Sequence, residues 1–162
     1  MSSGRSFEAW YRGSYARLFA AMLALTGDRE MASDATDEAF SRAWLHWGQV
    51  QEMVSPDGWS YRVALNVVRT RARRRRVEQR LLPRLVSRIT SPAPAGEVWE
   101  LVHALPPRQR IAVVLRYVAD LDEREIGEIM GVTRGTVAST LSAARHTLGI
   151  ALDADDVAEE RS

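Results

Sequence analysis

Apolar residues recur at steps of three and four along most of this chain, and this spacing is the strongest constraint on its fold. Large apolar side chains follow it from Phe7 to Leu23, which places them on one face of a helix. The pattern returns in later segments, and we find no segment with the apolar and polar alternation that marks a half-buried strand. The sequence therefore predicts an all-α protein.

Capping and turn residues divide the first half of the chain into three predicted helices. Gly27 is expected to end the first helix, and Asp28 to cap the second. Ser55 followed by Pro56 suits the cap and the first position of a third helix, which ends at about Arg80. The second helix is predicted to reach about Trp47. The residues expected on its inward face are Met31, Ala35, Ala39, Phe40, Ala43, Trp44 and Trp47.

A stretch rich in helix-breaking residues separates these helices from a second helical region. Residues 83–96 include the run S-P-A-P-A-G, which has too few large apolar groups to build a core. We interpret residues 83–96 as a flexible linker that joins two small helical domains, residues 1–82 and 97–152. The acidic tail, residues 153–162, is expected to fray.

The second helical domain carries the signals of a helix-turn-helix. Asp122 and Glu125 have the spacing of a capping box. Gly131 suits a tight turn, and Thr133 can cap the helix that follows. In this motif the second helix enters the major groove of DNA. A helical hairpin without a role in DNA binding is the alternative.

The charge of the chain is unevenly distributed, although its net value is only +1. Residues 62–88 carry ten arginines against one glutamate, whereas residues 1–61 carry five arginines against eight acids. Such a basic block usually binds a polyanion, most often nucleic acid, although a solvated surface is the alternative. Trp59 and Tyr61 precede the block and could stack on unpaired bases.

Composition excludes several kinds of chemistry. The chain has 162 residues, with no cysteine and no lysine, so thiol and lysine chemistry are ruled out. The three histidines lack a metal-ligand spacing, and no motif for a catalytic nucleophile is present. We therefore expect no catalytic residue, no metal, no cofactor and no enzymatic activity. The longest uncharged run is ten residues, too short to cross a membrane, and we expect a cytoplasmic protein.

Three motifs, taken in order, resemble the extracytoplasmic-function (ECF, group IV) sigma factors of bacterial RNA polymerase, and among them the actinobacterial SigE-like group. The first is L-T-G-D-R-E-M-A-S-D-A-T-D-E-A-F-S-R-A-W. The second is P-D-G-W-S-Y-R-V-A-L-N-V-V-R-T-R-A-R-R-R-R, and the third is A-L-P-P-R-Q-R-I-A-V-V-L-R-Y. Together they lie between residues 25 and 117, and the resemblance extends over nearly the whole chain. The resemblance implies that residues 1–82 form sigma region 2 and residues 97–152 form sigma region 4.

The resemblance also implies a division of labour. Region 2 would bind core RNA polymerase, at the clamp helices of its largest subunit, through Asp34, Asp37, Glu38, Phe40, Arg42 and Trp44. It would open the minus-ten promoter element with Trp59, Tyr61, Arg62, Asn66, Arg69 and Arg73. Region 4 would bind the polymerase flap and read the minus-thirty-five element with Thr133, Arg134, Thr136, Ser139, Ser142 and Arg145. The resemblance further implies promoter DNA and an anti-sigma factor as partners, and a monomer when free.

The predicted recognition helix departs from the family pattern. Where the family often has T-V-K/R-S-R/Q, this chain has T-V-A-S-T, which removes the usual basic residues. Arg134 and Arg145, with Arg108 and Arg110, leave at most four phosphate contacts. We therefore expect this domain to bind duplex DNA weakly by itself.

Two other classes of protein compete with this interpretation. A two-domain regulator with a LuxR-like output domain would explain the helix-turn-helix. It would not explain the acidic second helix or the arginine-rich third helix. A helical adaptor that only sequesters a protein partner leaves the arginine block without a role.

Overall fold

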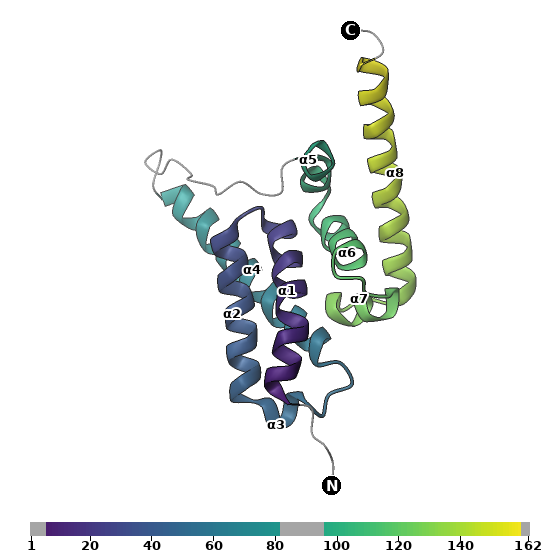
Figure 1. Ribbon diagram of the computed structural model, residues 1–162. Coiled ribbons are helices and arrows are strands. Elements are labelled where there is room, and N and C mark those ends of the chain that lie inside the picture. Colours follow the sequence, from purple (N-terminus) through teal and green to yellow (C-terminus); the bar gives the residue numbers. More distant parts are fainter. Residues whose placement is uncertain (1–5, 82–95, 160–162) are drawn as a thin grey trace. The chain divides into compact units, whose positions relative to one another are not determined.

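The computed structural model describes residues 6–81 and 96–159, and within these ranges the chain forms eight helices and no strand (Figure 1). The all-α prediction is confirmed. The chain divides into two compact units, residues 1–93 and 94–162. Apart from Gly96, the predicted linker lies outside the described residues.

The first unit consists of three long helices and one short helix. These are α1 (Phe7–Thr26), α2 (Arg29–Leu45), α3 (Trp47–Val50) and α4 (Pro56–Leu81). Both α1 and α4 pack against α2, and the inward face of α2 is built from small residues that are fully buried, Ala32, Ala35 and Ala39. Small side chains let neighbouring helices approach closely, so α2 lies directly against its two partners.

The ends of these helices follow local chemistry that the sequence predicts. Gly27 ends α1 with a left-handed φ of 63°. The Asp28 carboxylate accepts the Met31 backbone N–H at 3.0 Å, and so caps α2. At α4, the Ser55 hydroxyl oxygen accepts the Gly58 N–H at 2.9 Å.

Two details of α2 differ from the prediction. The helix ends at Leu45, and Trp47 belongs to the separate short helix α3. Trp44 was expected to face inward, but its side chain is 58% exposed. The reason is angular: successive residues of a helix differ by about 100°, and the buried stripe passes through Ala43. Trp44 therefore lies at the edge of the stripe. There its ring packs against that of Phe7, with 4.9 Å between the two ring centroids.

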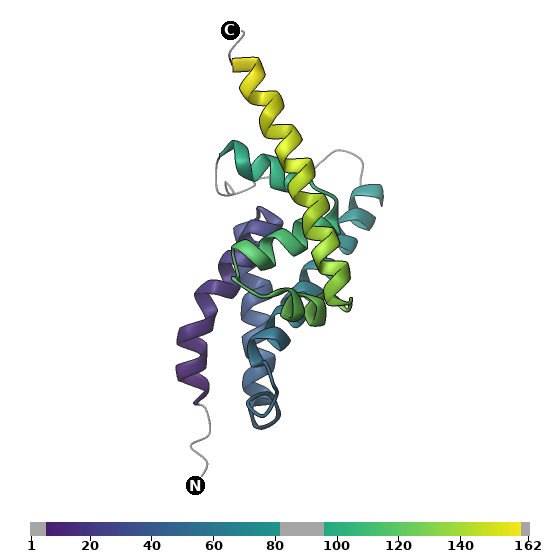
Figure 2. The same cartoon turned by 90° about the vertical axis from the view of Figure 1, so that its right-hand side faces the viewer.

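The second unit contains α5 (Glu97–Ala104), α6 (Pro107–Tyr117), α7 (Glu123–Met130) and α8 (Arg134–Glu159). Its core includes Leu115, Ile126, Val137 and Leu141, each at most 1% exposed. Figure 2 shows α8 as one continuous helix. The backbone of α8 continues past Leu152 and is helical to Glu159, so the helix includes most of the acidic tail. That stretch contains no glycine and no proline, the two residues that disfavour a helix most.

The turn between α7 and α8 has the geometry that a helix-turn-helix needs. Asp122 and Glu125 form the predicted capping box, with both hydrogen bonds at 2.8 Å. Gly131 has a φ of 70°, which an L side chain rarely adopts. At Gly127 an added Cβ would lie 2.8 Å from the Val132 carbonyl oxygen, so the turn folds back directly onto α7.

Gly127→Ala should destabilise the second unit by about 1–3 kcal/mol, because the new methyl group meets a backbone oxygen that can move only with the turn. Gly149→Ala is the matched control, since an added Cβ there meets nothing within 4 Å. It should stabilise α8 by about 0.5–1 kcal/mol. Urea unfolding of the full chain measures both changes. A Gly127→Ala protein as stable as the wild type contradicts this packing.

Candidate nucleic-acid interface

The helix α4 presents a basic row on the side opposite to its buried face. Arg62, Asn66, Arg69 and Arg73 follow steps of four, three and four, so their side chains share one face, and all four are exposed. Arg76 and Arg80 continue the same row. We call these six residues the outward row. The structure thus brings together four of the six residues predicted for the minus-ten element.

The other two predicted residues lie differently. Trp59 is half-buried near the start of α4. Tyr61 is only 3% exposed, because it lies on the face of α4 that packs into the bundle. Burial, with Asp57 nearby, raises the pKa of its hydroxyl, which stays protonated. A buried ring cannot stack on a base, so the expectation that Tyr61 contacts the minus-ten element is wrong.

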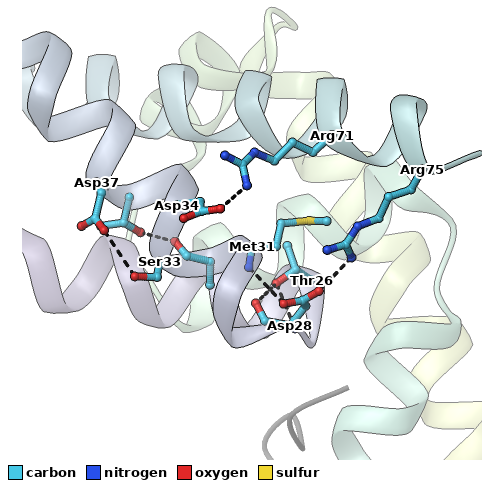
Figure 3. A network of polar contacts seen from close by, with 10 residues as sticks. Thr26, Asp28, Met31, Ser33, Asp34, Asp37, Arg71 and Arg75 are labelled. Atoms are coloured by element: carbon cyan, nitrogen blue, oxygen red, sulfur yellow. Dashed lines mark hydrogen bonds and ion pairs between the residues drawn. The ribbon is translucent and has the colours of Figure 1, made fainter. Parts of the chain in front are cut away.

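Two further arginines of α4 are turned toward α2. The Arg71 guanidinium pairs with the Asp34 carboxylate, and Arg75 pairs with Asp28 at 2.8 Å (Figure 3). We call these two ion pairs the seam. Burial acts to raise the pKa of Asp28, but the Met31 N–H bond and the Arg75 charge outweigh it and lower that pKa. With the exception of Arg74, the arginines of α4 are therefore divided between the outward row and the seam.

The start of α4 is tied to α1 by a residue that sequence reasoning missed. One carboxylate oxygen of Asp57 accepts the Trp10 indole N–H at 2.6 Å and the Ser14 hydroxyl at 2.7 Å. In the sequence Asp57 looks like an ordinary acid in the first turn of a helix. No local pattern indicates partners more than 40 residues away. Its contacts fix the beginning of α4, two residues before Trp59.

Part of the predicted polymerase-binding set lies on the surface of α2. Asp37 is exposed and accepts a hydrogen bond from the Tyr15 hydroxyl at 2.8 Å. It also accepts one from the Ser33 hydroxyl at 3.3 Å (Figure 3). Burial and the Asp37 carboxylate raise the pKa of Tyr15 to about 12. Glu38 and Arg42 form an ion pair at 2.6 Å on the same helix. Asp34, by contrast, faces α4.

The aromatic members of that set have opposite environments. Phe40 is 3% exposed and lies among the rings of Trp10, Tyr11 and Tyr15. It is therefore a core residue, and the expectation that it contacts a partner is wrong. Trp44 is well exposed, and Leu45 beside it is 76% exposed. Trp44 and Leu45 thus form an exposed apolar surface at the end of α2, and this surface, not Phe40, is the candidate for an apolar contact with a partner.

All six residues predicted for the recognition helix are exposed: Thr133, Arg134, Thr136, Ser139, Ser142 and Arg145. Thr133 lies at the N-terminus of α8, where its hydroxyl oxygen accepts the Thr136 N–H at 3.2 Å. Arg134 pairs with Glu123 of α7 at 3.2 Å. Arg145 donates to the Tyr117 hydroxyl of α6 at 3.0 Å. Both arginines of α8 in the described residues thus contact side chains of other helices in the same unit.

One of the other cations expected to contact phosphate has a structural role. The Arg110 guanidinium donates to the carbonyl oxygens of His103 at 2.5 Å and Leu105 at 3.1 Å. It therefore joins α6 to the end of α5. Arg108 is exposed. The number of cations available to phosphates in this unit is smaller than the sequence suggests.

The described parts of the chain contain neither a candidate metal site nor a candidate membrane span. No group of three or more histidine, cysteine or acidic side chains there could hold a metal ion. No described helix combines the length and apolar character needed to cross a bilayer.

Comparisons with known proteins agree with this arrangement. A family model described as "Sigma-70 region 2" matches residues 10–78, and one described as "Sigma-70, region 4" matches residues 95–148. The ECF RNA polymerase sigma factor SigM of Bacillus subtilis is 28% identical over 137 residues, which cover 78% of this chain and 83% of that protein. The RNA polymerase sigma-E factor of Streptomyces coelicolor is 28% identical over 163 residues, 96% of this chain and 92% of that protein.

A further sequence relative and a solved structure are also similar to this chain. SigE of Mycolicibacterium smegmatis is 29% identical over 144 residues, and the match spans 82% of this chain but 56% of that protein. Among solved structures, the fold is similar to the sigma factor RpoE of Bartonella quintana in complex with the anti-sigma factor NepR. That match has a TM-score of 0.77 and 21% identity, and covers 92% of this chain and 98% of the other.

Two sigma regions in the family's order, on a helical fold of this kind, define a bacterial transcription initiation factor of the sigma-70 type. The chain belongs to the sigma-70 family, in its ECF group.

Asp57→Ala should lower the free energy of unfolding of the first unit by about 1–3 kcal/mol, because Trp10 and Ser14 lose their common acceptor in a half-buried place. Ser14→Ala should cost less, since the indole keeps its bond. Glu52→Ala, at an exposed position, is the control. Denaturant unfolding followed by tryptophan fluorescence measures the three variants. Equal stability of Asp57→Ala and Glu52→Ala contradicts the role of Asp57.

Proposed function

We propose that this chain is a sigma factor, which binds core RNA polymerase and directs it to promoters that it recognises and melts. The outward row of α4 carries the proposal, because its arginines and Asn66 form an exposed face suited to nucleic acid. The matches to both sigma regions support it. The relatives are initiation factors, so the chain would lend sequence choice to the polymerase and catalyse no reaction itself. It would act in the cytoplasm.

Promoter opening is assigned to α4. Arginines of the outward row would hold backbone phosphates, and Asn66 can donate to and accept from the edge of an unpaired base. Trp59 offers a partly exposed ring at the beginning of the same helix. A base that stacks on an aromatic ring gains about 1–3 kcal/mol. This combination suits a single strand better than a closed duplex.

Polymerase binding is assigned to the exposed part of α2. Asp37, Glu38 and Arg42 offer charges that would steer association. Trp44 offers a large exposed ring, and tryptophan is among the residues that most often dominate the energy of an interface. Asp34 is the weakest member of this set, because the structure pairs it with Arg71.

The second unit would read the minus-thirty-five element through α8. Its exposed hydroxyl groups and few cations suit a weak reader of duplex DNA. Attachment to polymerase would raise the effective concentration of this domain at the promoter. An anti-sigma factor is a further proposed partner, since the similar RpoE structure is a complex with one.

Run-off transcription with core polymerase, on promoters from the neighbouring genes, tests the function. Asp37→Arg combined with Glu38→Arg should weaken binding to core polymerase and reduce the transcript, with the circular dichroism unchanged. Glu100→Arg combined with Glu128→Arg makes the same change of charge in the second unit at exposed positions, and should leave polymerase binding unchanged. A chain that binds promoters but never polymerase would be a helix-turn-helix regulator instead.

Asn66→Ala should impair strand opening more than formation of the closed complex, because its side chain is assigned to an unpaired base. Permanganate reactivity of thymines in the melted region measures opening, and a mobility-shift assay measures the closed complex. Thr70→Ala is a control at an exposed position one turn away. Equal permanganate reactivity of Asn66→Ala and wild-type protein removes Asn66 from the site.

A further inference from the structure

We propose that Asp34 of α2, and Asp28 at the cap of that helix, act as internal counter-ions that withhold Arg71 and Arg75 from nucleic acid. The inference rests on the proposed function, because it takes DNA as the polyanion that the arginines would otherwise bind. It gives the seam a role beyond holding two helices together.

The geometry of the seam places two carboxylates where phosphates would bind. In Figure 3 the side chains of Arg71 and Arg75, one turn apart on α4, both reach across to carboxylates of α2. A carboxylate offers a guanidinium the same kind of acceptor as a phosphate oxygen. Each of these arginines therefore already has the type of ligand that DNA would supply.

The ion pairs are exposed enough to exchange partners. The side chains of Arg71 and Asp34 are 44% and 41% exposed, and that of Arg75 is 50% exposed. Ion pairs at such sites are weak, so each should lower the affinity of the chain for DNA by a factor of only about two to five. Asp28 is more firmly placed than Asp34, because its carboxylate also caps α2.

This arrangement would lower non-specific binding by the chain before it meets polymerase. Such binding is driven mainly by the number of phosphates neutralised, and each contact adds about 0.7 to the salt slope on a single strand. With the seam closed, two of the arginines in the basic block add little to that number. The outward row keeps its full contribution.

Two matched pairs of variants of the full chain test the inference, with fluorescent oligo(dT) as the probe over a range of salt. Asp34→Asn and Asp37→Asn change the net charge equally on one helix, but in the structure Asp34 pairs with an arginine and Asp37 with hydroxyl groups. Asp34→Asn should bind about two- to fivefold more tightly than Asp37→Asn, with a salt slope larger by about 0.7. Asp34→Asn combined with Arg71→Gln should return to the wild-type affinity.

The second pair removes one arginine from each face of α4. Arg73→Gln, in the outward row, should weaken binding, whereas Arg71→Gln should leave it nearly unchanged. A merely structural seam predicts instead that Asp34→Asn and Arg71→Gln weaken binding alike. Equal affinities of Asp34→Asn and Asp37→Asn, or equal losses in Arg71→Gln and Arg73→Gln, overturn the inference. Run-off transcription reports separately on the proposed function, and its failure would contradict that function.

Discussion

The packing of α2 between α1 and α4 determines the rest of the first unit. Its inward face is lined by buried alanines, so the neighbouring helices approach closely and cannot rotate without meeting larger side chains. This packing sets the rotation of α4 about its own axis. Tyr61 and Leu65 are thereby buried, Asn66 and Arg73 face outward, and Arg71 lies beside Asp34. A single set of apolar contacts thus decides which arginines can meet nucleic acid.

Features that depend on local chemistry could be predicted from the sequence. Gly27, Asp28 and Ser55 mark helix ends through groups that lie within three or four residues of one another. The capping box at Asp122 and the left-handed Gly131 follow from the same kind of rule. The periodicity of the apolar residues also predicts correctly that the described chain is helical.

Features that depend on the register between distant helices could not be predicted. Periodicity indicates the direction of a buried face but not its width, so it does not reveal that Trp44 is exposed. The position of Tyr61 before the basic block likewise does not reveal that its ring is buried. Asp34 meets Arg71 across 37 residues, which no local pattern reveals. The family resemblance implies a partner-binding role for Asp34, and the structure adds that Asp34 pairs with Arg71 of α4.

Site-specific photo-crosslinking in the open promoter complex tests most directly the claim that one face of α4 meets DNA. A photoreactive residue would replace Arg73 in one protein and Arg71 in another, each assembled with core polymerase. These positions lie close together on opposite sides of the helix. We expect strong crosslinks to the minus-ten region from position 73 and weak ones from position 71. Equal crosslinking from both positions, or crosslinking from position 71 alone, would contradict the account.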